Sequence, residues 1–187
     1  MHLRTSLVAI AAVVASGLLA LSGTANATTT PITASFVSGY TSFAGSSYGC
    51  AGGSATGIAD NVADTITFSA LRVSCSTPLG SLTVSLNSGC TVIATFTGAT
   101  AGIDTALAGN AVFGSGTCVK VSAGGGICTY NVQGTVSATF DETTTQNRLI
   151  LNGPGTLANQ SFGCFGLMTG TFNLNNITFN TTPAVNF

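Results

Sequence analysis

Charge is scarce in this chain of 187 residues, since Lys, Arg, Asp and Glu together make up 5% of it. Of the four cationic residues, Arg4 lies within the first 27 residues, so three cations accompany five carboxylates in the rest of the chain. Such a chain cannot neutralise a row of phosphates, and it has no basic cluster to attract anionic lipids. We therefore expect no nucleic-acid partner.

Tryptophan is absent, and the one histidine is His2. Beyond residue 27, the usual general base for a serine or cysteine nucleophile is therefore missing. The cysteines show no CxxC spacing, which argues against a metal site. Asp141 and Glu142 are adjacent and are expected to be solvated in a hairpin turn, rather than to face each other as a glycosidase pair. We expect no enzymatic activity, no cofactor and no bound metal.

The long apolar run of the chain is confined to its N-terminal part. Arg4 precedes an apolar stretch from Leu7 to Leu21, and Ala25-Asn26-Ala27 has the small-x-small form of a signal-peptidase site. We predict cleavage after Ala27, which leaves residues 28–187 as a single secreted β domain; an uncleaved anchor is the alternative. No later stretch reaches the roughly 18 apolar residues of a transmembrane helix. The mature protein is expected to be extracellular or associated with the cell surface.

The six cysteines all follow residue 27, at Cys50, Cys75, Cys90, Cys118, Cys128 and Cys164. In an exported protein an even number of cysteines indicates disulfides. A short loop and strand separate Cys75 from Cys90, which favours a bridge between these two. The spacing of the other four leaves two alternatives open. Either Cys118 pairs with Cys128 and Cys50 with Cys164, or Cys128 pairs with Cys164 and Cys50 with Cys118.

Alternating apolar and polar residues dominate the chain after residue 30. Val, Ile, Phe and Thr recur with period two, and Gly, Asn, Ser and Pro interrupt them at short intervals, as in all-β domains. We predict an antiparallel β-sandwich or Greek-key barrel of about 8–10 short strands with disulfides. The alternation slips by one residue near Ala70, which predicts a bulge there. The Gly- and Ser-rich stretch from Ser38 to Gly57 is expected to be a long, loose loop.

Two tyrosines in that stretch, Tyr40 and Tyr48, are the candidate binding residues for a glycan or an apolar small molecule, because tyrosine combines an apolar ring with a polar tip. Phe43, between them, is expected in the core. Among the cations, Lys120 alone, or Arg72 paired with Arg148, could orient a carboxylate ligand. Lone basic residues on strands also protect sheet edges from aggregation.

Several motifs lie in the C-terminal half: GTVSATF at Gly134 to Phe140, LILN at Leu149 to Asn152, and GCFGL at Gly163 to Leu167 leading to GTF at Gly170. With these motifs the chain resembles a family of small exported actinobacterial β-rich proteins of unknown activity. A more distant similarity is to bacterial alkane-oxidation-activator-like secreted proteins. The resemblance spans about residues 65 to 180 and implies an extracellular β-rich accessory protein of the cell surface. It also implies a bridge between Cys128 and Cys164.

Three functions are compatible with these features. The first is a secreted, non-enzymatic structural or accessory protein of the cell surface, which self-associates because its edge strands lack protective charges. The alternative is a monomeric extracellular module that binds a glycan of the cell envelope or an apolar small molecule. A third is a membrane-inserting barrel, suggested by the alternation and by Phe187 at the end of the sequence.

Overall fold

The computed structural model describes residues 28–43, 45–77, 80–99, 103–113, 118–142, 146–158 and 171–187. The elements in these ranges are β1 (Thr29–Phe43), β2 (Ser46–Asp60), β3 (Thr65–Thr77), β4 (Gly80–Leu86), β5 (Val92–Thr97), β6 (Leu107–Phe113), β7 (Val119–Ala123), the 3-10 turn η1 (Gly124–Gly126), β8 (Cys128–Asp141), β9 (Asn147–Ala158) and β10 (Thr171–Thr182). Within these described ranges, no helix is long and apolar enough to cross a membrane.

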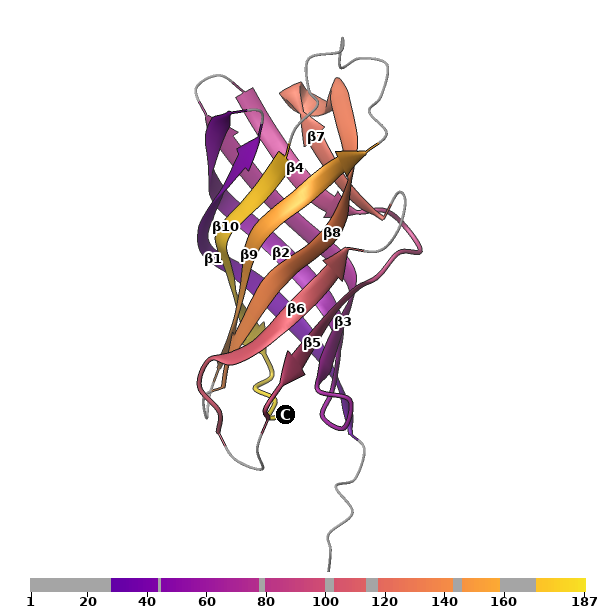
Figure 1. Ribbon diagram of the computed structural model, residues 1–187, viewed down its shortest axis with the longest axis vertical. Coiled ribbons are helices and arrows are strands. Elements are labelled where there is room, and N and C mark those ends of the chain that lie inside the picture. Colours follow the sequence, from indigo (N-terminus) through magenta and orange to yellow (C-terminus); the bar gives the residue numbers. More distant parts are fainter. Residues whose placement is uncertain are drawn as a thin grey trace, which may run out of the picture.

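The strands form one closed antiparallel barrel (Figure 1). The positions around the wall follow chain order, with β4 and β5 in one position and β6 and β7 in the next, and β1 closes the circle by pairing with β10. The all-β prediction is confirmed, but the sandwich is wrong, because the wall is a closed barrel of eight strands. A barrel whose wall positions follow chain order is an up-and-down barrel and not the predicted Greek-key barrel. The strands are also longer than predicted, reaching 15 residues in β1 and β2.

Ten strands make an eight-stranded wall because two positions in it are each filled by two strands in succession. Along β3, β5 pairs with the lower part, Thr65 to Phe68, and β4 pairs with the upper part, Arg72 to Thr77. Along β8, β6 and β7 divide the strand in the same way. The predicted bulge near Ala70 is confirmed, because the β2–β3 register shifts between Ala70 and Phe68.

A disulfide between Cys90 and Cys118 joins the two interruptions of the wall, since Cys90 lies between β4 and β5, and Cys118 directly precedes β7. The Asn87 amide also donates a hydrogen bond to the Cys118 carbonyl at 2.8 Å. A break in one strand is thus fastened to a break in its neighbour. This cross-link keeps β4 in line with β5, and β6 in line with β7.

The second described disulfide joins Cys50 of β2 to Cys75 of β3. The predicted Cys75–Cys90 bridge is wrong, because β4 runs away from Cys75 toward the middle of the barrel before Cys90 is reached. The Cys118–Cys128 bridge and both pairings suggested for Cys50 are wrong as well. Cys128 is also disulfide-bonded. Cys164, its partner according to the family resemblance, lies outside the described residues.

Apolar side chains fill the inside of the barrel. In the upper half Phe43 and Tyr130 meet edge to face, with ring centroids 5.1 Å apart. In the lower half Phe187 lies against Phe96 and Phe140, at centroid distances of 5.3 and 5.1 Å. The core prediction for Phe43 is confirmed, since 1% of its surface is exposed. Burial of these aromatic rings is a large part of what stabilises the barrel.

Residues 183–187 fold back over the lower end of the barrel, where Glu142 holds them. The Glu142 carboxylate accepts hydrogen bonds from the Phe187 amide at 2.7 Å and from the Asp104 amide at 2.9 Å. The Asn147 side-chain amide donates to the Val185 carbonyl. The prediction of a solvated turn is wrong for Glu142, which is 1% exposed, because its carboxylate satisfies two backbone N–H groups at the barrel mouth.

In the described part of the chain, two buried hydroxyl groups of the upper core have no hydrogen-bond partner, those of Thr41 and Tyr130. We expect Tyr130→Phe to stabilise the protein by about 1 kcal/mol, because it removes an unsatisfied buried hydroxyl and keeps the ring against Phe43. Urea unfolding of the two proteins at pH 7 measures this difference. A destabilised variant would show that the hydroxyl does have a partner.

The same pair of proteins differs in alkaline solution. Burial raises the pKa of Tyr130 above its ordinary value of 10.0. The folded state therefore holds the phenol proton more tightly than the unfolded state does. The resulting stabilisation is present below pH 10 and is lost as the pH rises toward the raised pKa. We expect the Tyr130→Phe variant to lose less stability between pH 9 and pH 11 than the parent protein.

Candidate functional site

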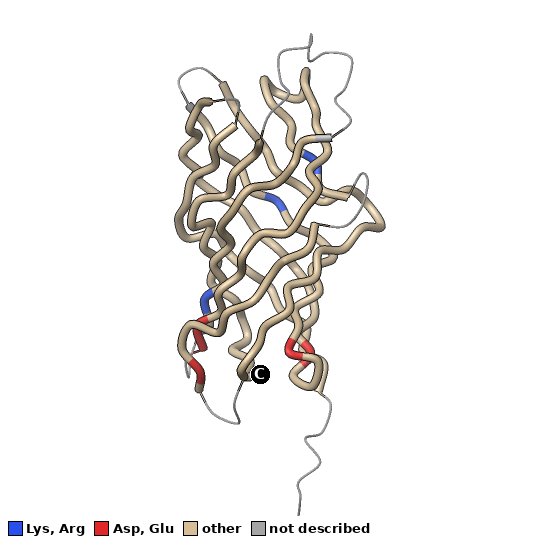
Figure 2. The backbone as a smooth tube through the Cα atoms, in the orientation of Figure 1, with Lys and Arg blue, Asp and Glu red and all other residues tan. Residues whose placement is uncertain are grey.

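The outer wall of the barrel is polar and almost uncharged. Its exposed strand residues are mainly hydroxyl-bearing and include Thr33, Ser35, Ser54, Thr56, Ser74, Ser76, Ser81, Thr95, Thr97, Thr135 and Ser137. Figure 2 shows the acidic positions of the barrel gathered at its lower end, with cationic positions both directly above them and higher up the wall. On a surface with so little charge, two neighbouring cations dominate the local electrostatic field.

Arg72 and Lys120 are these two cations, and strand alternation points both outward. Arg72 lies between the buried Leu71 and Val73, while Lys120 lies between Val119 and Val121, which are fully buried. Successive side chains of a strand point to opposite faces, so an apolar residue on each side directs the cation to the outer wall.

The fold brings the two cations onto one row across the wall. Arg72 of β3 is the register partner of Ser85 on β4, and Ser85 is the register partner of Lys120 on β7. Two strand spacings separate their backbones by roughly 10 Å. Both side chains are long enough to reach over the serine between them. A single anion above Ser85 is therefore within reach of both cations.

The row forms part of a depression of about 420 Å³ on the outer wall, which we call the outer groove. It is lined by Arg72, Ser81, Thr83, Ser85, Lys120, Ser122, Gly125 and Gly126. Arg72 and Ser85 also line an adjoining depression of about 390 Å³ over β2, β3 and β4. Cations flanked by several hydroxyl donors are suited to bind oxyanions such as carboxylate, sulfate or phosphate.

Glycines shape one end of the outer groove. Gly124 and Gly125 have φ angles of +60° and +71°, in the left-handed region that favours glycine. The turn η1 can therefore reverse the chain tightly after β7 and start β8. An added Cβ at Gly125 or Gly126 would meet no heavy atom within 4 Å, so the space beside these glycines is open.

Among the residues that the structure describes, no carboxylate side chain is close enough to neutralise the outer groove. Asp60 pairs in register with Thr65, seven residues before Arg72 on β3, which places it roughly 23 Å lower on the wall. Asp141 lies ten residues along β8 from Asn131, the register partner of Lys120, or roughly 33 Å away. Both separations exceed the screening length of about 8 Å in physiological salt. Anions from solution are thus the natural partners of the two cations.

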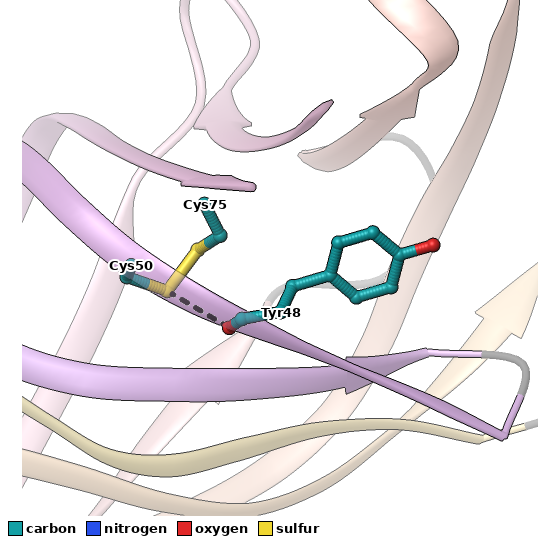
Figure 3. The surroundings of a disulfide bond; sticks show 3 residues. All are labelled: Tyr48, Cys50 and Cys75. Atoms are coloured by element: carbon teal, nitrogen blue, oxygen red, sulfur yellow. Dashed lines mark hydrogen bonds between the residues drawn. A yellow bond between two sulfur atoms is a disulfide. The ribbon is translucent and has the colours of Figure 1, made fainter. Parts of the chain in front are cut away.

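The two tyrosines predicted to bind together lie on opposite sides of the wall. The stretch from Ser38 to Gly57 is not a loop but most of the β1–β2 hairpin, so alternation decides which way each side chain points. Tyr40 is 48% exposed on the outside. Tyr48 packs against the core from the inside, near the Cys50–Cys75 bridge (Figure 3).

The cation pair also differs from the predicted one. Arg148 is the register partner of Asp141 near the lower end of the barrel, so it does not approach Arg72. The cation that lies near Arg72 is Lys120 instead. Period-two alternation indicates that Arg72 and Lys120 are solvent-facing. Their proximity, however, depends on β4 lying between β3 and β7, and no local signal in the sequence reports that order.

We expect inorganic phosphate to bind in the outer groove, weakly and with a strong dependence on salt. In an NMR titration, the largest amide shifts should be those of Arg72, Ser85 and Lys120 and of their strand neighbours. The double variant Arg72→Gln, Lys120→Gln should lose these shifts, and Arg148→Gln, which removes a similar exposed cation elsewhere, should keep them. Shifts spread evenly over the barrel would contradict a specific site.

The chain was also compared with known proteins. No family model, no curated protein and no solved structure matches it. The assignment of a function therefore depends on the residues and the geometry of the outer groove.

Proposed function

We propose that this chain is an exported, non-enzymatic accessory protein of the cell exterior that acts as a monomeric binding module for an anionic envelope component. The observation that carries the proposal is the row of Arg72, Ser85 and Lys120 in a hydroxyl-lined groove without a nearby carboxylate. Such a groove can hold an acidic group by charge and by hydrogen bonds together.

Export is supported by the signal-like residues 1–27 and by the disulfides, which persist in oxidising compartments. The resemblance of residues 65 to 180 to small exported proteins agrees with it. A non-enzymatic role is supported by the chemistry of the outer groove, whose side chains are cations and hydroxyls. None of its lining residues is a general base that could activate a hydroxyl nucleophile.

The choice between self-association and monomeric binding depends on the sheet edges. Self-association through the sheet would require edge strands without protective charges. Each of the ten described strands is paired on both sides, so the described barrel has no edge to offer. We therefore favour the monomeric module.

A membrane-inserting barrel receives less support from the side chains. Membrane-spanning barrels carry apolar residues outside and polar residues inside. The described wall has the reverse arrangement, with Ser and Thr outside and aromatic rings inside. Phe187, the residue that suggested a membrane strand, lies in the core against Phe96 and Phe140.

Dextran sulfate and dextran provide a direct test, because these two polymers differ in charge and share a backbone. We expect the mature protein to bind immobilised dextran sulfate in low salt and to pass through a dextran column. Loss of both cations in Arg72→Gln, Lys120→Gln should weaken binding about tenfold or more, given the strength of charge-assisted hydrogen bonds. The matched control Arg148→Gln should bind like the parent protein.

Light scattering on the same preparations should give the mass of a monomer at all concentrations. A loss of binding in the control as large as that in either single variant, Arg72→Gln or Lys120→Gln, would contradict the proposal, since each of these removes one charge and only net charge would then matter. Concentration-dependent dimers would indicate self-association and contradict the monomeric module. The candidate contact would then be Ile93 and Val112, which are exposed apolar register partners on β5 and β6.

A further inference from the structure

The upper part of the wall carries a second feature that the proposed function leaves unused, the exposed ring of Tyr40. In the described part of the chain, Tyr40 is the one aromatic residue among the exposed large apolar side chains, with 48% of its surface accessible. A large ring on a wall of Ser, Thr and Gly offers a flat apolar face to a ligand.

Strand register connects Tyr40 with the outer groove. Tyr40 of β1 pairs with Gly49 of β2, and Gly49 pairs with Ser76 of β3. Ser76 in turn pairs with Ser81 of β4, which lines the outer groove. All four residues are exposed, so they form one continuous outward row. Three strand spacings place Tyr40 roughly 14 Å from Ser81.

Small residues lie between Tyr40 and the outer groove along this row. Gly49 and Ser76 are the residues of the row that lie between them. A Cβ added at Gly49, or at Gly52 further along β2, would meet no heavy atom within 4 Å. Among the described residues of this row, a ligand between Tyr40 and Ser81 would therefore lie over a glycine and the short side chain of Ser76.

Ser85, which lies between the two cations, is four residues along β4 from Ser81, or roughly 13 Å, so the path from Tyr40 to the cations is longer than the span to Ser81. A path of this length exceeds one sugar residue or one oxyanion, so a ligand that reaches both ends must be a chain. The chemistry of the two ends defines its class. Arg72 and Lys120 call for a carboxylate, sulfate or phosphate. The Tyr40 ring suits the apolar C–H face of a sugar ring, and the intervening serines and glycines suit sugar hydroxyls.

We infer that the ligand is an anionic polysaccharide that runs across β1, β2, β3 and β4, with a sugar ring on Tyr40 and an acidic group between Arg72 and Lys120. The inference rests on the proposed function, because it uses the same pair of cations. It adds the polymeric nature of the ligand, its direction across the strands and a second contact point.

Calorimetric titrations with galacturonic acid and its oligomers up to the hexamer test the inference on the whole mature protein. Affinity should rise with chain length until the oligomer spans both contact points, and then level off. Tyr40→Ala should reduce affinity for the hexamer about fivefold and leave affinity for the monomer unchanged, because the monomer reaches only the cations. Val37→Ala, which trims another exposed side chain of β1, is the matched control and should change neither.

A sulfated hexasaccharide in place of the galacturonate hexamer identifies the preferred acidic group, and neutral maltohexaose should bind at least tenfold more weakly than either. Equal affinity for monomer and hexamer, or an unchanged hexamer affinity in Tyr40→Ala, would overturn the polysaccharide inference. The proposed function would still stand if Arg72→Gln, Lys120→Gln abolished binding of the monomer. If that double variant bound every ligand normally, the proposed function would fail and the inference with it.

Discussion

The pairing of β1 with β10 is the constraint on which the rest of this structure depends. It turns a row of strands into a closed wall, and it sets the register from Thr33 opposite Thr182 to Phe43 opposite Phe172. Closure places the apolar face of every strand around one interior and gives each described strand a partner on both sides. A protein with very few charged side chains thereby avoids exposed edges without the lysines that usually protect them.

Closure also determines where function can reside. Aromatic rings occupy the interior, and Glu142 fastens residues 183–187 across the lower end. The outer wall is therefore the surface available to binding partners, and its exposed residues are mainly Ser and Thr. Arg72 and Lys120 stand out on it because the acidic residues lie at the far lower end (Figure 2). The Cys90–Cys118 bridge supports this arrangement, since it fixes the break that follows β4, the strand lying between the two cations.

The sequence predicted what depends on local pattern. Phe43 was correctly assigned to the core. Period-two alternation identified much of β3, β4, β5, β8, β9 and β10 and the bulge near Ala70, but it missed most of the β1–β2 hairpin, because the Gly- and Ser-rich stretch from Ser38 to Gly57 was assigned to a loop. It could not predict closure, since a strand with one apolar face fits a sandwich as well as a barrel. The pairings of Cys50, Cys75, Cys90 and Cys118 were mispredicted because pairing depends on how far β4 extends before Cys90. Glu142 was assigned to solvent because its partners, the Asp104 and Phe187 amides, are distant in sequence.

Hydrogen exchange along β1 tests the closure most directly. Successive residues of an antiparallel strand direct their amides alternately to the two neighbouring strands, so β1 carries its own internal comparison. If the barrel is closed, the amides of β1 that face β10 should exchange as slowly as those that face β2, at rates set by global unfolding. Amides facing β10 that exchange orders of magnitude faster than their neighbours would contradict the closed barrel and the outer wall built on it.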